Sequence, residues 1–221
     1  MSTPAPEPPP DPGPHSASDP HAVPHPHSAS DPHSVPDPPP VPGPYAPVVR
    51  AVSASPSASV PERVDYVDPG DRVVAQGRRT AEAPDGLLRR YAATVCTDHA
   101  GRVLLYRRTA SARAYPGHYD VLVGGAVRTG EQYRAAALRE LREELGWAAA
   151  PGLAEVYRVR VDDPHGACFL TVHHWVADRA PRPDPREIAW CGFVAPLAVA
   201  TGGYTPLVPA GAEAVRRLFR L

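Results

Sequence analysis

Hydrophobic and polar residues follow regular periods only after about residue 62. Runs that alternate between apolar and polar side chains, together with short apolar runs, predict β-strands. The expected strands are Arg63–Val67, Arg72–Gln76, Tyr91–Thr97, Val103–Arg107, Val121–Val123, Val156–Val161, Ala167–Val176 and Glu187–Val194. Asp68-Pro69-Gly70-Asp71 and Asp98-His99-Ala100-Gly101 separate the first two pairs of strands and are typical of hairpin turns.

Two segments have helical periodicity instead. The first covers Gln132–Leu145 and ends at Gly146, which is a natural residue to follow a helix. The second covers Ala210–Leu221 and places its apolar side chains on one face. Because strands and helices mix without regular alternation, we expect an α/β fold in which a mixed sheet is sandwiched between helices.

The first 61 residues have a different composition from the rest. They contain 20 of the 31 prolines and no Trp or Phe, so they cannot bury enough apolar surface to offset the entropy of ordering. His15–Pro26 and His27–Pro38 are two copies of a 12-residue unit that match at ten positions. We expect a disordered low-complexity tail over residues 1–61, with weak metal capture or partner tethering as the alternative, followed by one domain over residues 62–221.

Charge and cysteine content exclude several classes of protein. Residues 62–221 carry 22 arginines against 19 acidic residues, which is far from the strongly basic surface of a nucleic-acid-binding protein. Cys96, Cys168 and Cys191 are widely spaced, so we expect buried thiols rather than disulfides or a zinc site. The absence of a signal-like start and of long apolar runs favours a soluble cytoplasmic protein without membrane contact.

The Gln132–Leu145 helix has three glutamates opposite its leucines. Leu138, Leu141 and Leu145 project within about 60° of one another, and Glu140, Glu143 and Glu144 lie on the other side. Like charges four residues apart, close to the negative end of the helix dipole, cost on the order of 1 kcal/mol. A divalent cation would offset this repulsion. A solvated acidic face, with Arg139 paired to Glu143, is the alternative.

The residues before and within this helix strengthen the prediction of a bound cation. Gly125, Glu131, Arg139, Glu140, Glu143, Glu144 and Gly146 stand at the seven fixed positions of the Nudix box, and Leu141 and Trp147 fill its apolar positions. With each residue type at roughly 5–7% of an average protein, a chance match is far below one in ten thousand. The chain therefore resembles the Nudix hydrolase family.

The resemblance implies roles for individual residues. Glu140, Glu143 and Glu144 would be catalytic residues that bind Mg²⁺, or Mn²⁺ in its place, together with the Gly125 carbonyl. Glu131 and Arg139 would form an ion pair that supports the site. Glu143 is our expectation for the residue that deprotonates the attacking water.

The same resemblance implies an activity and a partner. Nudix hydrolases cleave phosphoanhydrides with a divalent metal, so we expect a magnesium-dependent pyrophosphatase acting on a nucleoside diphosphate linked to another group, or on a related diphosphate. Its partner would be this small molecule and not a nucleic acid polymer. A homodimer is also common for the fold.

Flanking motifs resemble the Nudix branch that includes isopentenyl-diphosphate isomerase. The motifs are Glu62-Arg63-Val64-Asp65, Leu87-Leu88-Arg89-Arg90, Leu104-Leu105-Tyr106-Arg107-Arg108-Thr109 and Tyr115-Pro116-Gly117-His118-Tyr119-Asp120. That isomerase is one alternative function, but it uses a cysteine in the strand before the helix and metal-binding histidines, which Tyr119–Gly125 lacks. A non-catalytic ligand-binding module is the other alternative.

Two arginines outside the box are candidates for contact with phosphate. Arg107 and Arg108 end a predicted strand, and guanidinium groups bind phosphate well. The alternative is a solvated strand end.

Overall fold

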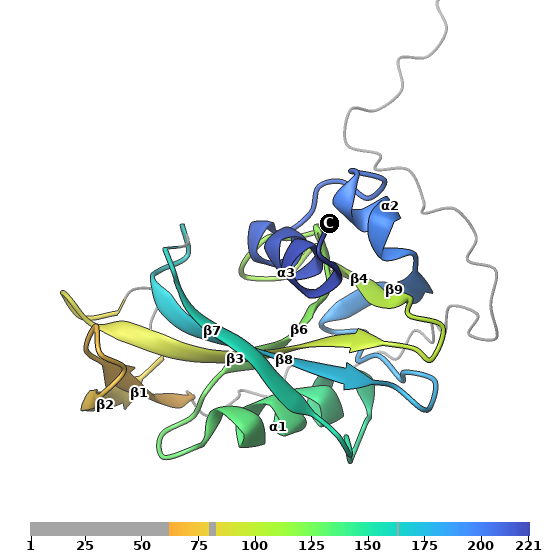
Figure 1. The fold of residues 1–221 in the computed structure, drawn as a ribbon. Helices are drawn as coiled ribbons and strands as arrows, with labels where there is room; N and C mark the ends of the chain where they lie inside the picture. Colours follow the sequence, from red (N-terminus) through yellow and green to blue (C-terminus); the bar gives the residue numbers. More distant parts are fainter. Residues whose placement is uncertain (1–61, 80–82, 163) are drawn as a thin grey trace, which may run out of the picture. The chain divides into compact units, whose positions relative to one another are not determined.

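The computed structural model describes residues 62–79, 83–162 and 164–221, so the predicted tail and its 12-residue duplication lie outside the described residues. The described residues form nine strands and three helices (Figure 1). Their bounds are β1 Arg63–Val67, β2 Val73–Arg78, β3 Leu88–Thr97, β4 Val103–Arg108, β5 Tyr119–Asp120, β6 Leu122–Ala126, α1 Tyr133–Leu145, β7 Ala154–Val161, β8 Cys168–Val176, β9 Ile188–Val194, α2 Pro196–Ala200 and α3 Pro209–Phe219.

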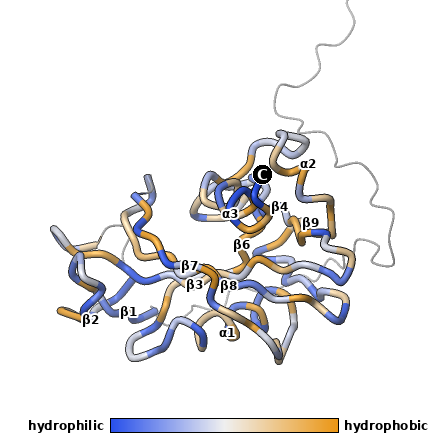
Figure 2. The backbone as a smooth tube through the Cα atoms, viewed as in Figure 1, coloured by the Kyte–Doolittle hydropathy of each residue, from blue (hydrophilic) through white to orange (hydrophobic). Residues whose placement is uncertain are grey.

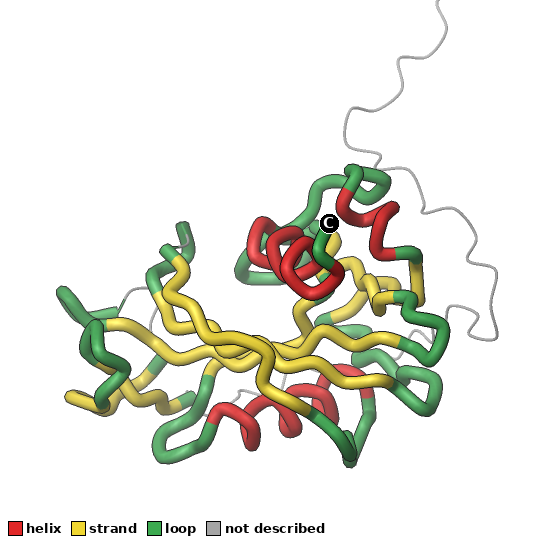
Figure 3. Tube along the Cα trace, viewed as in Figure 1, coloured by secondary structure: helices red, strands yellow, loops and turns green. Residues whose placement is uncertain are grey.

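Strand β3 is the centre of one mixed sheet. It pairs in parallel with β8 along Arg89–Thr97, and β7 continues the sheet beyond β8 in antiparallel register. Its other edge is shared by three strands in turn: β1 at its start, β6 along Tyr91–Val95, and β4 at its end. Helices lie on both sides of this sheet, as Figure 3 shows, and the predicted mixed sheet between helices is therefore confirmed.

The sheet opens where β3 meets β4. These two strands share only the pair Thr97 and Val103, because β4 then turns away and pairs with β5 and β9. β6 therefore pairs with the middle of β3, whereas most of β4 pairs with β5 and β9. The end of β4, at Arg107 and Arg108, pairs with β9 and not with β3.

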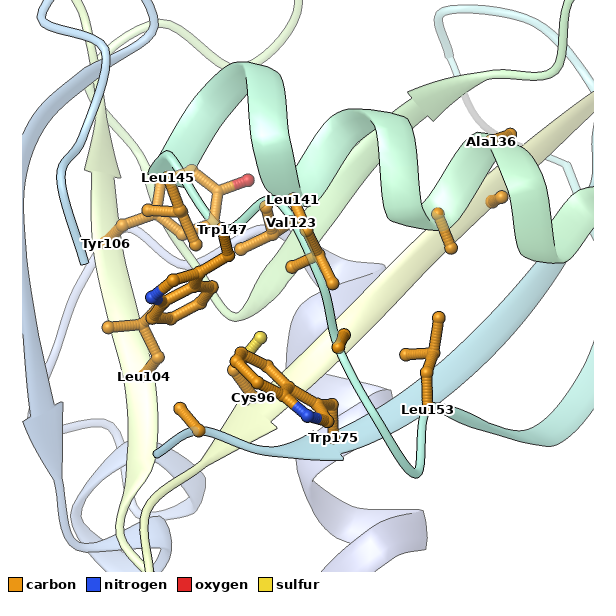
Figure 4. Packing of buried hydrophobic residues seen from close by; sticks show 14 of the residues in the cluster. Cys96, Leu104, Tyr106, Val123, Ala136, Leu141, Leu145, Trp147, Leu153 and Trp175 are labelled. Carbon is orange, nitrogen blue, oxygen red and sulfur yellow. The ribbon is translucent and has the colours of Figure 1, made fainter. Parts of the chain in front are cut away.

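Helix α1 covers one face of the sheet. Leu141 and Leu145 are fully buried, and Trp147, just after the helix, packs edge-to-face on Trp175 of β8 with ring centroids 4.9 Å apart (Figure 4). The helix ends at Gly146, whose left-handed conformation (φ 70°) lets its N–H bond back to the Arg142 carbonyl. Both ends of the helix agree with the sequence prediction to within one residue.

The opposite face is covered by α2 and α3. Val215 of α3 is fully buried, whereas Leu218 and Phe219 are partly buried against the same cluster. Because β3 lies between two helical layers, most of its residues are buried, and Figure 2 shows apolar and polar positions mixed along the sheet. In the described part of the chain, we find no helix with the length and apolar character that a membrane span requires.

The structure differs from the sequence prediction at several places, and strand β5 was not predicted. Strand β3 begins at Leu88, three residues earlier than expected. The predicted Val121–Val123 strand is β6, which begins at Leu122 and continues through Gly124 and Gly125. An added Cβ at Gly124 would overlap the backbone of β3, so glycine allows the two strands to pair there. Helix α2 was not predicted, since five residues are too few to display a helical period. The prediction of three buried cysteine thiols is confirmed.

Candidate metal-dependent active site

The three glutamates of α1 differ in exposure. Glu140 is only 9% exposed, Glu144 is partly buried, and Glu143 is exposed. The predicted acidic face of the helix is therefore only partly open to solvent, because Glu140 is buried. The helix packs closely enough on β6 to cover this side chain.

Glu140 lies directly over Gly125. A Cβ added at Gly125 would come within 2.5 Å of Glu140 Oε1 and 2.8 Å of its carboxyl carbon. Only glycine at this position therefore leaves room for the carboxylate. Burial raises the pKa of Glu140, and the charges of Glu143 and Glu62 add to this effect, while Arg139 opposes it.

Arg139 is buried and joins the loop before α1 to the helix. Its Nε and Nη2 donate to the two carboxylate oxygens of Glu131 at 2.9 and 3.0 Å, and Nη2 also donates to the Ala126 carbonyl at 2.9 Å. Its Nη1 lies 2.5 Å from Glu140 Oε1 and 3.2 Å from Glu143 Oε2. One guanidinium thus contacts three carboxylates, and the ion pair implied for Glu131 and Arg139 is present.

A second arginine links the first strand to this cluster. Arg128 Nε lies 3.2 Å from Glu62 Oε1, and its Nη2 lies 3.5 Å from Glu143 Oε2. Its backbone N–H also donates to Glu131 at 2.9 Å. No local pattern predicts a role for Glu62 or Arg128, because their contact joins residues 66 positions apart.

Glu144 has a different environment. Among the described residues, the ion pairs of the α1 carboxylates involve Glu140 and Glu143 and not Glu144. Burial raises the pKa of Glu144 well above its usual value, and the nearby charges of Glu140, Glu187 and Asp120 raise it further, with only Arg108 opposing them. This carboxylate therefore lies among other carboxylates without a paired cation.

Glu187, which precedes β9, is one of the carboxylates whose charge acts on Glu144. The Thr109 N–H donates to the Glu187 carbonyl at 3.2 Å, so the segment before β9 is fixed beside the end of β4. Two further residues near Glu144 were missed as site residues, Tyr106 and Asp120, although both lie in motifs that the resemblance had singled out. No local pattern marks them, because their contacts are made across strands.

Arg107 and Arg108 point in opposite directions. Arg107 donates to the Gly117 carbonyl at 3.2 Å and lies over the Tyr119 ring, in the cluster that faces α3. Arg108 donates to the Ala114 carbonyl at 3.0 Å, and its charge acts on Glu144. Neighbouring residues of a strand face opposite sides of the sheet. Only Arg108 of this pair therefore faces the carboxylates.

Within the described ranges, no three His, Cys, Asp or Glu side chains are arranged as a ready metal site. Two of the three α1 carboxylates are bound to Arg139, which accounts for their orientation. The donor set nevertheless suits a hard divalent cation, since it consists of carboxylate oxygens, one of which is partly buried and lacks a cationic partner.

Comparison with known proteins identifies the family. The NUDIX domain family model matches residues 87–218, which include α1 and all its glutamates. An uncharacterized Nudix hydrolase of Streptomyces coelicolor is 39% identical over 164 residues, covering 73% of this chain and 90% of the relative. An isopentenyl-diphosphate Delta-isomerase of Nocardia farcinica is 35% identical over 156 residues, 65% of this chain and 88% of the relative.

Solved structures agree with this assignment. DR0079 from Deinococcus radiodurans has a TM-score of 0.59 and 30% identity, and the match covers 72% of this chain and all of that one. The NUDIX domain of Shewanella oneidensis NrtR shares the fold, with a TM-score of 0.51 at 18% identity over 60% of this chain and 87% of that one. The fold and the glutamate-bearing helix define a Nudix domain. The chain belongs to the Nudix hydrolase family.

Proposed function

We propose that this protein is a magnesium-dependent hydrolase that cleaves the phosphoanhydride of a nucleoside diphosphate linked to another group, or of a related small diphosphate. The observation that carries the proposal is Glu144, a carboxylate that lies among Glu140, Glu187 and Asp120 without a paired cation. Holding like charges together without an obvious structural benefit is expected at a functional site.

The charged side chains of α1 have three different roles in this proposal. Glu140, Glu143 and Glu144, with the Gly125 carbonyl, would hold Mg²⁺ or Mn²⁺. A bound magnesium ion neutralises diphosphate charge and lowers the pKa of a coordinated water. Glu143 is exposed to solvent, which suits the removal of a proton from the attacking water. Arg139 keeps the loop and the helix together through Glu131.

Arg108 completes the proposed site from the other part of the sheet. Its side chain is 25% exposed, and its charge acts on Glu144. A guanidinium in this position can bind a phosphate oxygen of the substrate by charge-assisted hydrogen bonds. Arg107 has no such place in the proposal, because it packs over Tyr119 on the opposite side.

The experiment is a screen of the full chain against nucleotide sugars, nucleoside triphosphates and ADP-ribose, with and without Mg²⁺. ADP-ribose is included because it is the ligand of the NrtR structure. We expect metal-dependent release of phosphorylated products and a loss on the order of 100-fold or more in Glu144→Gln with the fold retained. Glu213→Gln, a half-exposed glutamate of α3, is the matched control and should keep wild-type turnover. Full activity in Glu144→Gln would remove that residue from the mechanism.

A second candidate is the isomerase reaction, favoured by the 35% identity to the Nocardia farcinica enzyme. Against it, the strand before α1 (Leu122–Ala126) contains no cysteine, and Cys96 of β3 is fully buried, so its thiol is not available to donate a proton to a substrate. Incubation with isopentenyl diphosphate, followed by analysis of the carbon skeleton, separates the two reactions. Binding of ADP-ribose without turnover of any substrate would instead indicate a non-catalytic module.

A further inference from the structure

Asp120 is the most enclosed carboxylate near the proposed site. It is the last residue of β5 and is 4% exposed. Its Oδ1 accepts hydrogen bonds from the Val121 and Leu122 backbone N–H groups at 2.8 and 3.0 Å. A Cβ added at Gly211 of α3 would overlap Oδ1, so the first turn of that helix closes over this oxygen. One carboxylate oxygen is therefore fully used by the backbone turn.

The other oxygen points to β4. Asp120 Oδ2 lies 3.4 Å from the Tyr106 hydroxyl and 3.9 Å from Arg108 Nη1. The Tyr106 hydroxyl lies 2.8 Å from the Leu122 carbonyl oxygen and accepts a hydrogen bond from Arg108 Nη1 at 3.4 Å. Since Leu122 begins the strand that carries Gly125, these contacts join the arginine of β4 to the strand beneath Glu140.

The two backbone hydrogen bonds alone do not explain why residue 120 is an aspartate. An asparagine could accept the two backbone hydrogen bonds without a buried charge. Burial raises the pKa of Asp120 to about 6, so the ionised carboxylate at neutral pH is held at an energetic cost. The charged groups that face it are Arg108 and the carboxylate of Glu144. The negative charge on Oδ2 therefore serves to hold the Arg108 guanidinium in position.

We propose that Asp120 and Tyr106 are positioning residues that fix the Arg108 guanidinium beside Glu144, where it binds a phosphate group of the substrate. The Ala114 carbonyl, which accepts from Arg108 Nε, provides the third point of support. Nε and Nη1 of Arg108 are thereby oriented before any ligand binds, which lowers the entropic cost of binding. The proposal rests on the proposed function for the identity of the ligand.

The test is a double-mutant cycle on the full chain with Asp120→Asn, Arg108→Met and the double variant. The probe is imidodiphosphate, a diphosphate analogue in which an NH group replaces the bridging oxygen, and its affinity is measured by calorimetry in Mg²⁺. We expect Arg108→Met to weaken binding by roughly tenfold or more and Asp120→Asn by about fivefold. In the double variant, Asp120→Asn should add less than about twofold, because it acts through the arginine.

Two measurements exclude a merely structural effect. Mn²⁺ should still bind every variant with the stoichiometry of the wild type, since none removes an expected metal ligand. Tyr106→Phe keeps the buried ring and should reproduce part of the Asp120→Asn loss, and it replaces that variant if Asp120→Asn fails to fold. Additive effects in the cycle, or unchanged affinity in both Asp120→Asn and Tyr106→Phe, would overturn the proposal.

The outcome also separates this proposal from the hydrolase assignment. If wild-type protein hydrolyses a diphosphate but the cycle is additive, the positioning role is wrong and the activity stands. If it binds imidodiphosphate with a non-additive cycle yet cleaves nothing, the positioning role stands and the hydrolase assignment is wrong. Absence of any binding of imidodiphosphate overturns both.

Discussion

Helices α1 and α3 cover opposite faces of the same sheet, yet they bury different kinds of side chain. The buried residues of α3 are Gly211, Ala214 and Val215, and its charged residues pair with one another near solvent. Helix α1 buries Arg139 and Glu140 beside its leucines. Both helices stabilise the sheet by burying apolar surface, but only α1 also holds charge away from water. The comparison teaches that the site is marked by burial of charge rather than by the number of charges.

The largest effect should come from removing the buried cation of α1. Arg139→Met leaves Glu140 buried without its partner, and we expect a loss on the order of 3–5 kcal/mol in the free energy of unfolding. Arg216→Met, which breaks an exposed pair with Glu213 on α3, should cost less than about 1 kcal/mol. Urea denaturation measures both. Equal losses would show that the two helices do not differ in the way described.

An intermediate effect should follow from the pH dependence of Asp120. The pKa of Asp120 is about 6 in the folded protein against 3.8 ordinarily, so the folded state binds the proton more tightly. Stability from this group is therefore present at low pH and is lost as pH rises from about 4 to 7, by up to roughly 3 kcal/mol. Asp120→Asn cannot ionise and should escape this loss.

The measurement is the free energy of unfolding of wild type and Asp120→Asn at pH values from 4 to 7, without metal. The difference in favour of the variant should grow with pH, because only the wild type must bury a new charge. A constant difference across this range would mean that Asp120 keeps the same pKa on folding.

The smallest effect is expected at Arg107. Its guanidinium lies 6.0 Å from the Tyr119 ring centroid, so Arg107→Met should cost about 0.5–1 kcal/mol of stability. Turnover should change by less than about twofold, in contrast to Arg108→Met. Thermal unfolding and steady-state kinetics on the same preparations check both statements. A large loss of turnover in Arg107→Met would contradict the assignment of the two arginines to opposite faces.

Local patterns were enough to predict the parts of the fold that depend on periodicity. Helix α1 was predicted to within one residue because Leu138, Leu141 and Leu145 repeat at helical spacing and Gly146 ends the run. Strand β3 was predicted too short, since Arg89 and Arg90 interrupt its apolar pattern, although tertiary contacts keep both in the strand. The family motif supplied the glutamates, which periodicity alone left open as a solvated acidic face.

The remaining site residues depend on contacts that no local pattern contains. Asp120 meets Tyr106 and Arg108 only because β5 pairs with β4. Arg108 faces Glu144 and Arg107 does not, but the sequence could not say which of two adjacent residues would do so until the register of β4 was known. The burial of Glu140 likewise depends on how closely α1 approaches Gly125.

The Asp98–Arg102 turn joins β3 to β4 and is stabilised by its own aspartate. Asp98 Oδ1 accepts from the Ala100 and Arg102 N–H groups at 3.0 and 2.9 Å, and β3 and β4 share only one residue pair beyond it. Inserting one residue into this tight reversal would shift the following strand by one position and rotate every side chain of it to the other surface. Arg107 and Arg108 would then exchange sides, so the length of a remote connection affects which guanidinium faces helix α1.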